Sequence, residues 1–76
     1  MVSQHDNDIA VLVSLNQAAM MTSMSRGMVN RYRATGRFPV AVDLGDRRVA
    51  FVKSEVLGWI QKKIEARITA QVRKQQ

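Results

Sequence analysis

The sequence predicts a mostly helical α+β domain, in which a pair of short helices precedes a two-stranded hairpin and a long C-terminal helix. Apolar residues recur at helical spacing over residues 14–35 and again from residue 53, whereas over residues 38–52 they alternate with polar or smaller ones. The first spacing is that of an amphipathic helix and the second is that of a strand. Capping serines and a Gly-Asp dipeptide mark the borders of these stretches.

The helix pair is predicted from two caps. Ser14 can cap the first helix, and Gln17 can return a hydrogen bond to the Ser14 backbone N–H, which is the capping-box pattern. Ser25 can cap a second helix, which should end near Thr35 because Gly36 favours a left-handed conformation. Two helices joined by a short turn, with the second helix basic, are typical of a helix-turn-helix, whose second helix enters the DNA major groove. A plain helical hairpin with solvated arginines is the alternative.

The segments around the helix pair are less regular. Residues 1–10 are polar for most of their length, and we expect a disordered N-terminal tail. Residues 9–13 form a short apolar run that is either a strand or an extended lead into the first helix. Strands are predicted at 38–44 and 47–52, with Gly45-Asp46 as the turn. A hairpin of two strands is marginal alone and must pack on the helices.

The last helix is predicted over residues 53–74, with Ser54 at its N-cap. Val56, Trp59 and Ile60 share one face at helical spacing and should pack in the core. The apolar stripe continues further than a small core needs, so it offers a surface for self-association. Its four-residue step drifts around the helix and argues against a long coiled coil. The continuing stripe consists of Ile64, Ile68 and Val72.

Composition limits the classes of function. The 76 residues carry a formal net charge of +6, with a pI near 10.9, which favours a polyanionic partner. The sequence has no cysteine, and its one histidine, His5, lies in the N-terminal tail. It also has no glycine-rich phosphate loop. We therefore expect no catalytic constellation, no metal site and no cofactor, and thus no enzyme.

The basic residues are concentrated in the middle of the chain. Seven of the twelve Lys and Arg residues lie within residues 25–53, where two Asp residues oppose them. Six of the seven are arginines, whose paired donors suit phosphates and guanine edges. On a helix, Arg26, Asn30 and Arg33 fall on one side. Gly27 is a poor helix former there, explained either by close backbone approach to a partner or by simple tolerance.

Three motifs follow one another along the chain. They are Leu-Val-Ser-Leu-Asn-Gln-Ala-Ala at 12–19, Gly-Arg-Phe-Pro at 36–39 and Leu-Gly-Asp-Arg-Arg-Val-Ala-Phe at 44–51. Over about residues 11–62 the chain resembles the AlpA family of phage and genomic-island regulators, which are similar to excisionase and MerR-type DNA-binding domains. The resemblance implies a winged helix-turn-helix domain over residues 11–76, with the hairpin as its wing.

The resemblance also implies which residues contact DNA. They lie on the second helix and its cap, where Asn30 could pair with an adenine edge and Ser25 suits a phosphate, and on the wing. The chain departs from the family pattern at Gly27 and Met28, where small hydroxyl residues are usual, at Asn30, where an aromatic is common, and at Phe51, where tryptophan is frequent. The predicted DNA-binding residues are Ser25, Arg26, Gly27, Met28, Asn30, Arg31, Arg33, Arg47 and Arg48.

The resemblance implies a small DNA-binding factor of a mobile genetic element. We expect a recombination directionality factor, an excisionase that binds and bends attachment-site DNA. The alternative is a transcriptional regulator of an integrase gene, and a protein–protein adaptor is an alternative from another class. The expected partners are double-stranded DNA, an integrase and a second copy bound through Ile64, Ile68 and Val72, with no membrane. No apolar run is long enough to span a bilayer, so we expect a cytoplasmic protein. The resemblance implies that it is nucleoid-associated and encoded by a bacterium or phage.

Overall fold

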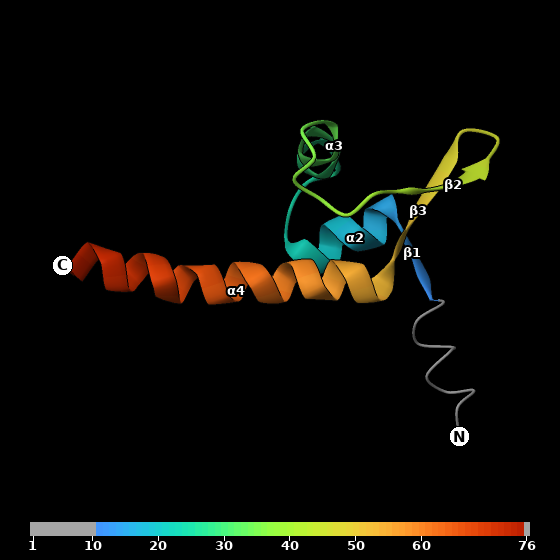
Figure 1. Cartoon of the computed structure of the whole chain (residues 1–76). Coiled ribbons are helices and arrows are strands. Elements are labelled where there is room, and N and C mark those ends of the chain that lie inside the picture. The colour runs from blue at the N-terminus through green and yellow to red at the C-terminus, as the bar shows by residue number, and fades with distance from the viewer. Residues whose placement is uncertain (1–10, 76) are drawn as a thin grey trace, which may run out of the picture.

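A computed structural model describes the backbone of residues 11–75 and the side chains of residues 11–68. The predicted disordered tail, residues 1–10, lies outside the described residues. The observed fold is mixed α+β and mostly helical, as predicted, and it is compatible with a winged helix. In chain order the elements are β1 (Leu12–Ser14), α2 (Leu15–Thr22), α3 (Arg26–Ala34), β2 (Val42–Gly45), β3 (Arg48–Val52) and α4 (Lys53–Gln75), as Figure 1 shows.

The capping box predicted at the start of α2 is confirmed. The Ser14 hydroxyl accepts a hydrogen bond from the Gln17 backbone N–H at 3.1 Å, and the Gln17 side-chain oxygen accepts from the Ser14 N–H at 2.8 Å. At the other end, Ser23 adopts a left-handed φ of 59°. The N–H of Met24 then donates to the Ala19 carbonyl at 3.0 Å. This closure ends α2 and leads the chain directly into the next helix.

The cap and the end predicted for α3 are also confirmed. The Ser25 hydroxyl accepts from the Met28 backbone N–H at 3.1 Å. Thr35 closes the helix, and Gly36 follows with a φ of 72°, a conformation that glycine adopts without strain. Val29 is completely buried and belongs to the hydrophobic core. Burial of this residue leaves the polar side of α3 outward.

The sheet has three antiparallel strands in the order β1-β3-β2. The predicted hairpin is present as β2 and β3, and the apolar lead that could be a strand or an extended segment contributes β1, with Val13 opposite Phe51. The backbone N–H of Lys53 donates to the Val11 carbonyl at 2.9 Å, next to the β1–β3 pairing. Helix α4 begins at Lys53, directly after the last residue of β3. Ser54 therefore lies inside the first turn of α4, and its prediction as the N-cap is wrong.

The hairpin turn lies one residue later than predicted. Asp46 and Arg47 are its central residues, and both have left-handed φ angles, 53° and 63°. Two consecutive positive φ angles are typical of a type I′ turn, whose twist matches that of the strands. The register shifts between Asp43 and Gly45. The Asp43 carboxylate accepts a hydrogen bond from the Gly45 backbone N–H at 2.8 Å, which stabilises the backbone at this register shift. Because Gly45 still belongs to β2, the turn begins at Asp46.

Residues 38–41, predicted as the start of a strand, form a loop. Phe38 is buried in the core, and its ring centre lies 5.4 Å from that of Phe51. Val40, by contrast, is 83% exposed. The alternation of apolar residues in this segment therefore reflects one anchoring side chain and not a strand. The loop carries the chain from the end of α3 to the sheet.

Trp59 joins α4 to the end of α3. Its indole N–H donates to the Arg37 carbonyl at 2.8 Å. Its ring centre lies 5.0 Å from that of Phe38 and 6.1 Å from that of Tyr32. Trp59 packs with Val56 in the core, as the helical spacing predicted. Trp59 therefore contributes to the position of α3 relative to α4.

Within residues 11–75, no helix combines the length and the apolar character that crossing a bilayer would demand.

Trp59→Phe should lower the free energy of unfolding by about 1–2 kcal/mol, because the Arg37 carbonyl loses its hydrogen-bond donor while an aromatic ring is retained. Urea denaturation followed by circular dichroism measures the change. Gln61→Ala, an exposed substitution on the same helix, is the control and should stay within about 0.5 kcal/mol of the parent. Equal stability of the two variants would contradict the role given to Trp59.

Candidate nucleic-acid interface

The outward side of α3 carries most of the predicted contact residues. Arg26, Asn30 and Arg31 are exposed. The first turn of α3 has no acidic residue, and its last turn holds Arg31 and Arg33. The structure therefore gathers these exposed side chains on one helix, whose buried residue is Val29. The remaining predicted residues of this helix and its cap, namely Ser25, Gly27 and Met28, are exposed as well.

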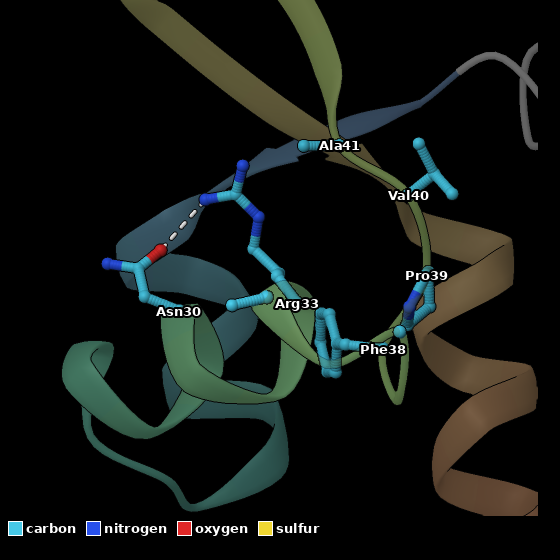
Figure 2. Close-up of a pocket in the computed structure, with 8 residues that line it drawn as sticks. Asn30, Arg33, Phe38, Pro39, Val40 and Ala41 are labelled. Atoms are coloured by element: carbon cyan, nitrogen blue, oxygen red, sulfur yellow. Dashed lines mark hydrogen bonds between the residues drawn. The ribbon is translucent and has the colours of Figure 1, made fainter.

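Arg33 differs from its neighbours because it is half-buried. Its terminal nitrogen donates to the side-chain oxygen of Asn30 at 2.8 Å, a bond drawn in Figure 2. Its guanidinium carbon lies 5.6 Å from the centre of the Phe51 ring. Both residues were predicted as DNA contacts on one side of the helix, but the bond between them was not predicted. Asn30 and Arg33 are three residues apart, and side chains at that spacing on a helix are neighbours, so the sequence could have indicated this bond.

The wing carries the other two predicted residues. Arg47 lies in the turn and Arg48 is the first residue of β3, and both are exposed. Figure 1 shows α3 and the hairpin rising from the same side of α4. The structure therefore brings α3 and the hairpin, the two elements that carry these cations, to one side of α4, although they are separate in the sequence.

An open groove of about 580 Å³ lies beside the outward side of α3. One wall is α3 and the other is the loop that leads to β2, as Figure 2 shows. The Asn30–Arg33 pair lies at the polar side of this groove. The groove was not predicted, because residues 38–41 were expected to form a strand. The lining residues are Asn30, Arg33, Ala34, Gly36, Phe38, Pro39, Val40 and Ala41.

Arg37 is an exposed cation that was not among the predicted DNA-binding residues. Its guanidinium carbon lies 4.2 Å from the centre of the Tyr32 ring, and its Nε donates to the Thr35 hydroxyl at 2.8 Å. These contacts hold the charge at the C-terminal end of α3. Helical periodicity could not reveal them, because the chain leaves the helix at Gly36 before it reaches Arg37.

The backbone around Gly27 has room for a side chain. A Cβ atom at this position would meet only the Ser25 hydroxyl, at the ordinary contact distance of 3.9 Å. Packing within the described residues therefore does not require glycine here. The two explanations left open by the sequence, close approach of a partner and simple tolerance, both fit this geometry.

Chemically, the arrangement offers hydrogen-bond donors and positive charge. The guanidinium groups and the backbone N–H groups at the start of α3 suit phosphate oxygens and the acceptors of base edges. Within the part of the chain that the structure describes, no three His, Cys, Asp or Glu side chains lie close enough to hold a metal ion. The site is thus suited to binding a polyanion.

Comparison with known proteins gives a match to a protein family. The model of the family described as "Prophage CP4-57 regulatory protein (AlpA)" matches residues 11–64. The matched region spans the helix pair, the sheet and the first half of α4, and it includes every predicted DNA-binding residue. No curated protein and no solved structure matches the chain.

Arg47→Gly should raise the free energy of unfolding by about 0.5–1 kcal/mol, because glycine adopts the left-handed turn conformation without the steric cost of a side chain. The same change should weaken binding to duplex DNA, because it removes a cation from the wing. Urea denaturation and gel retardation measure the two effects.

The matched control is Arg47→Ala, which removes the same cation and keeps a side chain at the strained position. It should weaken DNA binding equally and should not stabilise the fold. If both variants bind DNA as tightly as the parent, the tip of the wing does not contact the duplex.

Proposed function

The chain belongs to the AlpA family of phage-related DNA-binding regulators, and from this premise we propose that it is a recombination directionality factor, an excisionase that binds and bends the attachment-site DNA of a mobile element. The observation that supports this proposal most directly is the position of α3 and the hairpin on one side of α4 (Figure 1). Two cationic projections on one side suit a partner that is long, regular and negatively charged.

In the proposed complex α3 lies in the major groove. Arg26, Asn30 and Arg31 face the base edges and the adjacent phosphates, while the Ser25 hydroxyl and the first N–H groups of the helix bind a phosphate. The residues on α3 thus supply sequence preference, and the phosphate contacts set the orientation of the protein on the duplex. The wing cations, Arg47 and Arg48, bind the backbone or the adjacent minor groove.

Bending follows from binding at these two points. A duplex held in the major groove by α3 and at the flank by the wing gains contacts when it curves toward the protein. Bending a site of 20–30 base pairs costs of order 1–6 kcal/mol, which additional cation–phosphate contacts can offset. Several copies bound to neighbouring sites would add their bends and direct a partner integrase toward excision.

Self-association along the DNA would use α4. This helix runs past the rest of the fold (Figure 1), and Ile64 and Ile68 on it are 41% and 56% exposed. The side chain of Val72, the third residue of the predicted stripe, lies outside the described side chains. Apolar residues exposed at helical spacing favour a short crossing contact between two copies of α4.

A second function is favoured by the description of the family as a regulatory protein. A regulator of an integrase gene would use the same α3 and wing at a promoter. An adaptor that binds proteins through α4 would instead give no DNA retardation and no salt dependence.

The two DNA-dependent functions separate in a pair of assays with the purified chain. We expect excision by the partner integrase on its attachment-site substrate to rise at least tenfold when the chain is added, together with a permuted-fragment gel shift that reports bending. No effect on excision, combined with a clear change in output from the integrase promoter, would favour the regulator instead.

Arg31→Ala should weaken specific DNA binding by about 1–3 kcal/mol, whereas Arg48→Ala should weaken binding to all sequences and reduce the salt slope by about one. Retardation of specific and random duplexes over a range of salt concentrations measures both. Lys62→Ala removes one charge from the exposed surface of α4 and serves as the control. Parent-like binding by both arginine variants at moderate salt would contradict the proposed placement.

A further inference from the structure

The bond between Arg33 and Asn30 fixes which atoms of the Asn30 amide face outward. An arginine side chain has only hydrogen-bond donors. The Asn30 atom 2.8 Å from the Arg33 nitrogen is therefore the carbonyl oxygen, and the amide nitrogen points away from Arg33, as Figure 2 shows. The exposed amide thus presents its two N–H donors to a partner.

Arg33 is itself held in place by the core. Its guanidinium lies 5.6 Å from the ring centre of Phe51, which is completely buried, and the Arg33 side chain is half-buried. A cation in contact with an aromatic ring and bonded to an amide loses the freedom of an exposed arginine. The orientation of Asn30 is therefore set by β3 through Arg33, before any DNA is bound.

This orientation conflicts with the expected pairing of Asn30 with adenine. Asparagine recognises adenine by accepting from its N6 amino group and donating to its N7, so it needs both amide atoms. In this structure Arg33 occupies the carbonyl oxygen. The second lone pair of that oxygen lies beside the Arg33 cation, whose own N–H donors disfavour the approach of the adenine amino group.

We propose that Asn30 and Arg33 act as one donor unit that selects guanine and not adenine at the base pair facing Asn30. Guanine presents two adjacent acceptors, N7 and O6, in the major groove, and thymine presents one, O4. The outward N–H groups of Asn30 match the acceptors of guanine. This inference rests on the proposed function, since it assumes that α3 enters the major groove.

Enrichment of random duplex sequences by the full chain tests the inference. The base pair facing Asn30 is the one whose preference disappears in Asn30→Ala. At that position the parent should enrich guanine over adenine by about tenfold. Arg33→Met keeps an unbranched apolar stem and removes the hydrogen-bond donors, so it frees the Asn30 carbonyl and should shift the preference to adenine.

Arg33→Lys and Lys62→Met are the matched controls. The lysine variant retains a donor for the Asn30 carbonyl and should keep guanine, and Lys62→Met removes one charge from α4 without touching this pair. Asn30→Asp is a second variant that does not depend on replacing the half-buried arginine. It keeps the bond to Arg33 and presents only acceptors, so guanine should give way to cytosine, which offers an amino donor.

Each contrary result has a distinct meaning. Adenine enriched by the parent at the Asn30 position, guanine retained by Arg33→Met in a folded variant, or no position altered by Asn30→Ala would overturn the inference and leave DNA binding intact. Failure of the parent to retard any duplex would overturn the proposed function, and this inference with it. Circular dichroism of each variant confirms that a folded chain is compared.

Discussion

Contact among four aromatic side chains is the constraint on which the rest of the structure depends. Tyr32 from α3, Phe38 from the loop, Phe51 from β3 and Trp59 from α4 form a continuous series of edge and tilted ring contacts. A domain of this size has little apolar surface to bury, so a few large rings supply much of the available stabilisation. Because the rings come from different elements, they also set how those elements are arranged.

The same cluster links the core to the candidate interface. Phe51 and Arg48 belong to one five-residue strand, so the strand that anchors the core also carries a cation of the wing. On the other side, Phe51 contacts the guanidinium of Arg33, which in turn holds the Asn30 amide. The spacing between the cations of α3 and those of the wing is therefore determined by packing around one buried ring. Substitutions within the core would change the candidate interface through these contacts.

Local interactions explain which features were predictable from the sequence. The caps at Ser14 and Ser25 involve backbone groups three residues away, so their signals are complete within a short stretch. The sequence left open whether residues 9–13 form a strand, and it wrongly predicted a strand at 38–41, because the structure of each segment depends on a distant partner in β3. In the candidate site, too, features set by local interactions were predictable and features set by distant residues were not. The exposure of Arg26 and Arg31 follows from helical spacing, whereas the half-buried position of Arg33 depends on Phe51, eighteen residues along the chain.

At two positions of the interface the sequence holds a residue that is unfavourable for the fold itself. Gly27 weakens a helix that has room for a side chain, and Arg47 adopts a left-handed conformation that costs a residue with a Cβ roughly 1–2 kcal/mol. The two positions are unfavourable in opposite ways. Gly27 lacks a side chain where one would fit, and Arg47 has a large side chain where glycine would adopt the backbone conformation more easily. No rule of local stability explains both. In the proposed complex, close backbone approach at the start of α3 would account for Gly27, and contact with phosphates would account for the cation at the tip of the wing.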